Sequence, residues 1–286
     1  MTNISTVKPH NTCNTFKELI PKDAFFSWID SLKKYYRIIG PVKAGNQTIF
    51  QEVDSSKRLY MNYTSTMLSP GKLFLYKPRE ELFRFNMHGK ISVKEIQPVA
   101  EKQVIIGVHP CDMNAIFYLD KTFLGKYKDP NYRIRRENTI IISLNCTQVS
   151  PNCFCSSVGT GPFLNTNSNY DILITDFEDA YLVEIKSKRA EKLFKIKGKT
   201  AGMKEMKQKR EKEKFLLSSF KKTIPMKGLD ELFMENMEHP VWQRVAEERC
   251  LSCSNCVMVC PTCFCYDIVD ETSMDLKTVR RFRHLD

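Results

Sequence analysis

The sequence predicts an N-terminal α/β domain followed by a smaller, helical domain that is rich in cysteine. Two continuous apolar runs, Gln103–His109 and Thr139–Asn145, have the length of buried strands, and a segment with helical periodicity lies between them. Strand, helix and strand at this spacing are typical of an α/β core. Near the other end, six of the eleven cysteines lie within Cys250–Cys265, directly after segments with helical periodicity.

The first hundred residues predict one helix and two strands. The segment PKDAFFSWIDSLKKYY begins at Pro21, a residue favoured in the first helical turn, and four of its apolar side chains share one helical face. These side chains are Phe25, Trp28, Ile29 and Leu32. Two short strands follow at RIIGPV (37–42) and TIFQEV (48–53), separated by the turn-like KAGN. Between Leu59 and Pro98, prolines interrupt the pattern, so no element is predicted there.

The α/β core is expected to continue to about Ile185. The run QVIIGVH leads into a helix with Asp112 near its start as a cap. The apolar face of this helix consists of Met113, Ile116, Phe117 and Leu124. The second buried strand ends at Cys146, and YDILITDF and AYLVEI then alternate around EDA as a hairpin does.

The net charge of +11 belongs to one segment of the chain. Lys186–Lys222 holds 15 Lys and Arg against 4 Asp and Glu, so the rest of the chain is neutral. A solvated, partly helical connector is the ordinary explanation, and a patch that steers an acidic partner protein is the alternative. The segment lacks the interleaving of aromatic and basic residues that is typical of a base-stacking platform, so nucleic-acid binding is not expected. We therefore divide the chain into an α/β domain (1–185), a basic connector (186–227) and a helical domain (228–286).

The helical domain begins with Leu229–Cys250, which predicts two short helices broken at His239-Pro240. A further helical piece is predicted at Ser273–Asp286. No stretch of the sequence is long and apolar enough for a membrane span, and the N-terminus lacks the pattern of a signal peptide. We expect a cytoplasmic protein, where clustered cysteines favour metal ligation or redox chemistry over disulfides.

The cysteine run itself has the spacing of an iron–sulfur motif. Cys250, Cys253, Cys256 and Cys260-Pro261 form C-x2-C-x2-C-x3-C-P. Three thiolates with two-residue gaps suit one cluster, and the fourth cysteine of such a run commonly binds another cluster in two-cluster proteins. Zinc is the alternative, but structural zinc sites use separated pairs of cysteines rather than one continuous run.

Four further cysteines follow the two buried strands. Cys111 lies just past the first strand and Cys146 just past the second, where the carboxyl ends of parallel strands meet at one edge of the sheet. Cys153 and Cys155 lie in the next loop, near the glycines of SSVGTGP. We expect these four to form a second metal site, an iron–sulfur cluster rather than zinc. Separate buried thiols remain the alternative, because cysteine is often a small core residue.

Other chemistry has little support in the sequence. Cys13, in a polar N-terminal stretch, is expected to be a bystander. His109 could act as the base for a Cys111 nucleophile, although a structural histidine is the ordinary explanation. Neither a G-x-G-x-x-G fingerprint nor a phosphate loop occurs, so the chain is not expected to bind NAD(P)H or flavin by itself.

Two blocks of the sequence, 107–162 and 239–271, carry a resemblance to a known family. They are similar to the beta subunits of cytoplasmic nickel–iron hydrogenases, also called sulfhydrogenases or sulfur reductases. The A subunit of anaerobic sulfite reductase shares the same pattern. The likeness covers most of the chain except the basic connector.

The resemblance implies a non-catalytic electron-transfer subunit with [4Fe-4S] clusters. Such a subunit relays electrons between a flavin/[2Fe-2S] NAD(P)H oxidoreductase subunit and a catalytic partner. That partner is a nickel–iron hydrogenase pair or, in the alternative complex, a sirohaem sulfite reductase subunit. The family's C-terminal domain is of the helical ferredoxin type. When the ligand roles of the family are assigned to the matching positions of this sequence, Cys250, Cys253 and Cys256 hold one cluster and Cys260 reaches toward a second.

The sequence departs from the family pattern at one point. That pattern has a second C-x2-C-x2-C-x3-C-P run downstream, whereas this chain stops at Asp286 without one. We expect that the chain is truncated; the alternatives are ligands from another polypeptide, or local closure of the first cluster by Cys260, Cys263 or Cys265. The alternative from a different functional class is a zinc-stabilised interaction module, in which the cysteines are purely structural.

Overall fold

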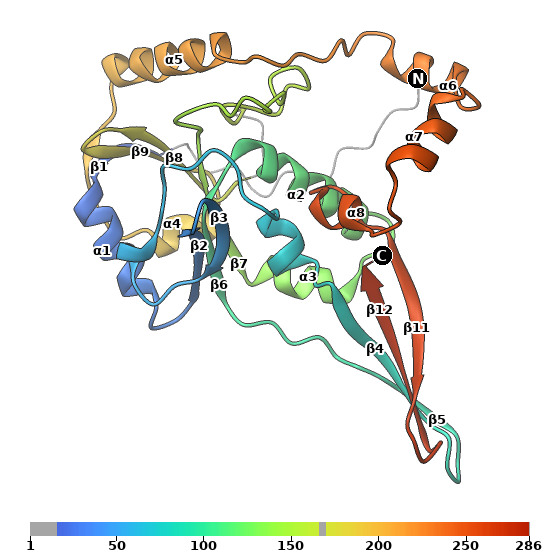
Figure 1. Ribbon diagram of the computed structural model, residues 1–286. Helices are drawn as coiled ribbons and strands as arrows, with labels where there is room; N and C mark the ends of the chain where they lie inside the picture. Colours follow the sequence, from blue (N-terminus) through green and yellow to red (C-terminus); the bar gives the residue numbers. More distant parts are fainter. Residues whose placement is uncertain (1–15, 166–169, 286) are drawn as a thin grey trace.

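A computed structural model describes residues 16–165 and 170–285 (Figure 1). Its centre is an eight-stranded mixed sheet in the order β10-β1-β9-β8-β7-β6-β2-β3. The bounds of these strands are β1 (Phe16–Pro21), β2 (Arg37–Ala44), β3 (Gln47–Glu52), β6 (Gln103–Val108), β7 (Thr139–Leu144), β8 (Ile172–Phe177), β9 (Ala180–Ile185) and β10 (Lys199–Thr200). The inner strands β2, β6, β7 and β8 run parallel to one another, whereas the outer pairs are antiparallel.

Helices cover both faces of this sheet, as in an α/β sandwich (Figure 1). On one face, α1 (Lys22–Leu32) and α4 (Lys188–Leu193) pack on the apolar side chains of the inner strands. On the other face lie α2 (Pro110–Phe123), α3 (Pro130–Glu137) and the π-helical turn η2 (Gly71–Leu75). Burial of apolar surface on both faces is the main driving force for this arrangement.

The predicted elements of the N-terminal half are confirmed. The four predicted apolar residues of α1 are all buried, and β6 and β7 are buried at every position. The predicted hairpins are β2–β3, turning at Gly45 with φ +60°, and β8–β9. Two details of α2 differ. The helix begins at Pro110, so Asp112 lies inside its first turn rather than at the cap position. Of the predicted apolar face, Met113 and Ile116 are buried, whereas Phe117 is half-buried and Leu124 follows the end of the helix.

A second sheet of four strands projects from the main body and contains the C-terminal strands (Figure 1). Its order is β11 (Tyr266–Thr272), β12 (Thr278–Leu285), β4 (Arg79–Asn86) and β5 (Ser92–Glu95). The helical prediction for Ser273–Asp286 is therefore wrong. The residues Leu276, Val279 and Phe282 mimic helical spacing, but pairing of β12 with both β11 and the distant β4 overrides that local pattern.

The two predicted helices before the cysteine run are confirmed as α6 (Leu229–Glu235) and α7 (Val241–Arg249), and the short helix α8 (Asn255–Val259) follows. The basic connector is partly helical, as expected, with α5 (Met203–Ser218) as its longest element. It also adds β10 to the edge of the main sheet beside β1. The division into domains at 185 and 227 stays a prediction; β4 and β5 pair with the C-terminal strands.

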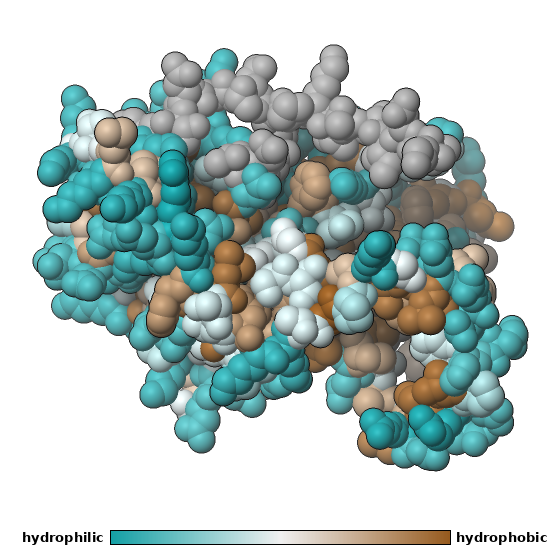
Figure 2. All heavy atoms as spheres, turned by 90° about the horizontal axis from the view of Figure 1, so that it is seen from above, coloured by the Kyte–Doolittle hydropathy of each residue, from teal (hydrophilic) through white to brown (hydrophobic). Residues whose placement is uncertain are grey.

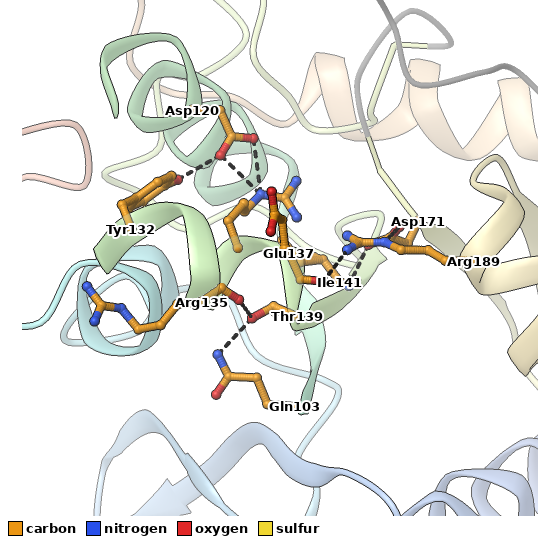
Figure 3. A network of polar contacts seen from close by, with 10 residues as sticks. Gln103, Asp120, Tyr132, Arg135, Glu137, Thr139, Ile141, Asp171 and Arg189 are labelled. Atoms are coloured by element: carbon orange, nitrogen blue, oxygen red, sulfur yellow. Dashed lines mark hydrogen bonds and ion pairs between the residues drawn. The ribbon is translucent and has the colours of Figure 1, made fainter. Parts of the chain in front are cut away.

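One buried carboxylate, Asp171, ties three segments of the α/β core together (Figure 3). It accepts hydrogen bonds from the backbone N–H of Ile141 at 2.9 Å and the Ser187 hydroxyl at 2.6 Å. It also accepts two from Arg189, at 2.7 and 2.8 Å. Burial raises the pKa of Asp171, but the bonds and charge of Arg189 outweigh that effect and hold the pKa below its usual value.

This lowered pKa gives a testable pH dependence. The stabilisation by Asp171 is fully present above the unfolded-state pKa, about 3.9, and is lost as the pH falls through the lower folded-state value. We expect Asp171→Asn to reduce the free energy of unfolding at pH 7 by about 1.5–3 kcal/mol, a typical effect for hydrogen bonds to charged groups. Urea denaturation at several pH values should show the difference from wild type shrinking below about pH 4. A constant difference would contradict the assignment.

A buried ion network joins the projecting sheet to the main body. Glu80 of β4 contacts Arg135 of α3 at 2.5 Å and also pairs with Arg283 of β12. Arg283 makes a second ion pair with Asp129 at 2.6 Å. The Glu80, Arg135 and Arg283 side chains are each no more than 6% exposed. Strand β12 is thereby fastened to the helix that covers the main sheet.

Candidate iron–sulfur centre

The cysteine run lies on a tightly wound segment between α7 and β11. Ser252 and Ser254 have left-handed φ values of 52° and 57°, which turn the chain on either side of Cys253. Cys250, Cys253 and Cys256 are exposed, so their thiols are available to a cluster at the surface. The two-residue gaps of the motif thus coincide with two backbone turns and the start of α8.

Hydrogen bonds to sulfur already occur within this segment. The N–H of Ser252 donates to Cys250 Sγ at 3.4 Å, and Cys260 Sγ lies 3.4 Å from the Thr262 hydroxyl. Burial raises the pKa of Cys260, but hydrogen bonds from Thr262 and from the N–H of Cys263 outweigh it. The positive charge of Lys72 lowers the Cys260 pKa further. Such contacts stabilise thiolates, the form in which cysteine binds iron.

The segment is fastened to the main body by two polar contacts and one aromatic contact. The buried Lys72 of η2 donates to the Val257 carbonyl of α8. The Tyr76 hydroxyl donates to the Phe264 carbonyl at 3.3 Å, and the Phe264 ring meets Phe123 of α2 edge-on. These contacts hold the inner side of the segment and leave the outer thiols accessible.

Removal of the Lys72 contact should loosen the cysteine run selectively. We expect Lys72→Met, which keeps the apolar stem but lacks the donor, to increase amide hydrogen exchange in residues 250–265. A hydrogen bond to a charged group stabilises by about 1.5–3 kcal/mol, so exchange there should be roughly tenfold faster or more. The exposed Lys77, changed to Met, is the matched control. Equal exchange in both variants would show that Lys72 does not hold the segment.

The other predicted cysteines gather at the carboxyl edge of the parallel strands, as expected. Cys111 lies in the first turn of α2 after β6, and Cys146 follows β7, the neighbouring parallel strand. Cys153 and Cys155 lie in the loop after Cys146. Cys111 is exposed and the other three are half-buried. We refer to these four residues as the rim cysteines.

The rim cysteines affect the pKa values of one another. Burial raises the pKa of Cys146, and the nearby Cys155 and Cys153 raise it further. Although Cys111 has exposed surface, the protein that surrounds its thiol raises the pKa of Cys111 as well, with further contributions from Asp112, Cys146 and Cys155. The Asp112 carboxyl, beside Ser69, has its own pKa raised to about 6 by burial.

None of the ten cysteines in the described part of the chain is in a disulfide. Across residues 16–165 and 170–285, no three Cys, His, Asp or Glu side chains lie close enough to share a single metal ion. The fit of the C-terminal run to a cluster therefore depends on its soft thiol donors, its backbone turns and its hydrogen bonds to sulfur. On these grounds, Cys250, Cys253, Cys256 and Cys260 fit as candidate ligands. Cys263 is half-buried and Cys265 exposed, and both lie next to the run. Cys13 lies outside the described residues.

His109 has a different environment from the one a thiol enzyme requires. Its ring stacks on Tyr63, with centroids 3.9 Å apart. Burial lowers the pKa of His109 to about 4, and a hydrogen bond to the Thr64 backbone opposes the shift only in part. Among the described residues, its Nε2 has no hydrogen-bond partner. The geometry thus offers a buried, stacked histidine rather than a base directed at Cys111.

Comparison with known proteins identifies the family. Residues 249–286 match the family model of the 4Fe-4S dicluster domain. The chain is 32% identical over 269 residues to sulfhydrogenase 2 subunit beta of Pyrococcus furiosus, which covers 91% of this chain and 76% of that subunit. The chain belongs to the sulfhydrogenase beta subunit family. No solved structure matches it.

Membership in the sulfhydrogenase beta subunit family confirms two predictions from the sequence. The cofactor is the [4Fe-4S] cluster, and the chain is an iron–sulfur electron-transfer subunit. The matched domain begins at Arg249, next to the first cysteine of the run. In the described part of the chain, none of the helices has the length and apolar character needed to cross a bilayer.

The sequence did not indicate the residues that support the site. Lys72 and Tyr76 lie in the Leu59–Pro98 stretch, where no element was predicted. A lysine inside the otherwise apolar segment GKLFLY was the available signal, because a buried lysine needs a polar partner.

Proposed function

We propose that this chain relays electrons between a flavin/[2Fe-2S] NAD(P)H oxidoreductase subunit and a nickel–iron hydrogenase catalytic subunit. The observation that carries the proposal is the C-x2-C-x2-C-x3-C-P run, with its first three cysteines exposed, in a chain related over 91% of its length to a sulfhydrogenase beta subunit. Cys250, Cys253 and Cys256 hold one [4Fe-4S] cluster. Cys260 reaches toward a second cluster.

The protein's own role in this relay is binding and positioning. The cluster, when bound, accepts and donates single electrons. The N–H of Ser252 and the Thr262 hydroxyl donate to ligand sulfurs, and Lys72 places a positive charge beside Cys260. Hydrogen bonds to sulfur and nearby charge set the reduction potential of such clusters. The exposure of Cys250, Cys253 and Cys256 keeps the site close to any docked partner.

Apolar side chains surround this exposed site and suit a protein partner. Large exposed apolar residues are concentrated on α6, α7 and the cysteine run: Leu232, Phe233, Met234, Met237, Trp242, Val245, Leu251, Val259 and Phe264. Figure 2 shows apolar surface on the right-hand side of the molecule, where Figure 1 places these helices. Exposed apolar residues grouped in this way are typical of interaction surfaces.

Rapid-mixing absorption spectroscopy with separately purified partners tests the relay. The NAD(P)H-reduced flavin subunit should bleach the cluster absorption of this chain, and addition of the hydrogenase catalytic subunits should restore it with evolution of hydrogen. Electron delivery to a sirohaem sulfite reductase subunit but not to the hydrogenase would instead assign the chain to the sulfite reductase complex. Failure of the flavin subunit to reduce the chain would overturn the proposal.

A further inference from the structure

We propose that the rim cysteines, Cys111, Cys146, Cys153 and Cys155, bind an additional iron–sulfur cluster outside the 249–286 dicluster domain. This site lies on the α/β sheet. It does not depend on the identity of the electron-transfer partners.

The topology of the sheet brings Cys111 to the same edge as Cys146 and the loop that follows it. Strands β6 and β7 are parallel neighbours, so the residues that follow them emerge at the same edge. Cys111 follows β6 in the first turn of α2, and Cys146 follows β7. The remaining two cysteines come from the loop that Cys146 begins. One edge of the sheet thus carries all four thiols.

The loop after β7 folds back on itself and returns Cys153 and Cys155 to the same edge. Asn145, just before the loop, bonds to the end of the loop and to the neighbouring strand. Its side-chain carbonyl accepts from the N–H of Leu164 at 3.0 Å, and its amide donates to Thr175 of β8. The N–H of Cys146 donates to the Pro162 carbonyl at 3.1 Å. Residue 146 and the end of the loop are therefore held in direct contact.

A second set of bonds joins the loop to the start of α2, beside Cys111. The Asn114 amide donates to the Pro110 carbonyl at 2.8 Å and to the Thr160 carbonyl at 3.3 Å. The N–H of Thr160 donates to the Cys155 carbonyl at 3.0 Å. Through Asn114, the turn that carries Cys155 is fixed against the turn that carries Cys111.

Gly161 shows how tightly the Cys155 thiol is enclosed. A Cβ atom at Gly161 would lie 2.8 Å from Cys155 Sγ and 3.7 Å from Pro110 Cβ. The sulfur therefore lies against the loop backbone, close to the residue that precedes Cys111. Any larger side chain at position 161 would displace the sulfur.

A pair of disulfides and a single zinc ion are the two alternatives to a cluster. All four cysteines have free thiols, so the site is not a pair of disulfides. A single zinc ion would hold its sulfurs about 3.8 Å apart, given Zn–S bonds of 2.3 Å. No three potential ligands of the described chain gather around one ion in this way. A four-iron cluster binds each thiolate to a different iron and so requires wider spacing.

One segment of the chain, 69–72, links the rim site to the candidate centre of the C-terminal domain. Ser69 lies beside Asp112, the neighbour of Cys111, whereas Lys72, three residues further on, contacts Val257 of α8. Gly71 lies between them and packs on Ile116 of α2. The segment 69–72 therefore contacts both the helix that carries Cys111 and the helix that carries Cys256.

The test uses the full-length chain, produced and reconstituted without oxygen, and measures iron and acid-labile sulfide per chain. The rim variant is Cys146→Ser with Cys153→Ser. The C-terminal variant is Cys253→Ser with Cys256→Ser, and Cys13→Ser is the control. The rim variant should lose about four iron and four sulfide per chain and keep the electron paramagnetic resonance signal of the C-terminal cluster. The C-terminal variant should keep the iron of the rim site.

The C-terminal variant changes only exposed positions and leaves the rim intact, so it tests the rim site even if the rim variant folds poorly. Wild-type iron in the rim variant, or no iron in the C-terminal variant, would overturn the inference while the proposed relay stands. Stoichiometric zinc without sulfide at the rim would also overturn it. A wild-type chain without any iron would overturn the proposed function as well.

Discussion

Serine at both positions 253 and 256 is expected to remove the C-terminal cluster while the fold persists. Each substitution takes away a thiolate of the proposed [4Fe-4S] ligand set, and a serine hydroxyl is a far weaker ligand for iron. Both cysteines are exposed and lie outside the two apolar clusters, so little packing is lost. Iron and sulfide should fall by about four per chain, and the absorption of that cluster should disappear.

Circular dichroism separates loss of the cluster from loss of the fold, since the double variant should keep the wild-type spectrum of the α/β core. The matched controls are Cys263→Ser and Cys265→Ser, made singly. Retained iron in both controls would show that neither Cys263 nor Cys265 is needed to complete the cluster held by Cys250, Cys253 and Cys256. Wild-type iron content in the Cys253→Ser, Cys256→Ser variant would contradict the assignment of these two residues as ligands.

Replacement of Glu80 by alanine is expected to cause a large loss of stability. The substitution leaves Arg135 without its carboxylate and leaves Arg283 with Asp129 alone. Removal of one partner from a buried ion pair costs about 3–5 kcal/mol, because an uncompensated charge remains in the interior. The Glu80 side chain is 6% exposed, so water cannot take over its role.

Denaturant unfolding of Glu80→Ala, followed by fluorescence and circular dichroism, measures this loss. Glu271→Ala is the matched control, since Glu271 pairs with Arg79 on the same sheet but is 44% exposed. An exposed ion pair contributes about 0–1 kcal/mol, so the control should remain close to wild type. Equal stability of the two variants would show that the network around Glu80 is dispensable.

The α/β core was predictable because its pattern is local. Strands β6 and β7 are buried on both faces and therefore appear as continuous apolar runs in the sequence. The same strands fix where Cys111 and Cys146 emerge, so the gathering of the rim cysteines followed from sequence and topology alone. The spacing of Cys250–Cys260 likewise identified the cofactor without structural information.

The projecting sheet could not be predicted, because its pattern is not local. Every residue of β11 is exposed, so the alternation that marks a half-buried strand is absent. Strand β12 obtains its stability from β4, which lies almost two hundred residues earlier in the chain. The link from Lys72 to α8 is similarly distant in sequence. Such contacts depend on tertiary structure rather than on propensity.

The central claim, that this chain is an iron–sulfur electron carrier, is tested most directly on the wild-type protein purified without oxygen. Iron and sulfide analysis is combined with electron paramagnetic resonance before and after reduction by dithionite. We predict equal iron and sulfide in multiples of about four per chain, and a signal typical of a reduced [4Fe-4S] cluster that appears only on reduction. A colourless protein with stoichiometric zinc and no acid-labile sulfide would contradict the claim.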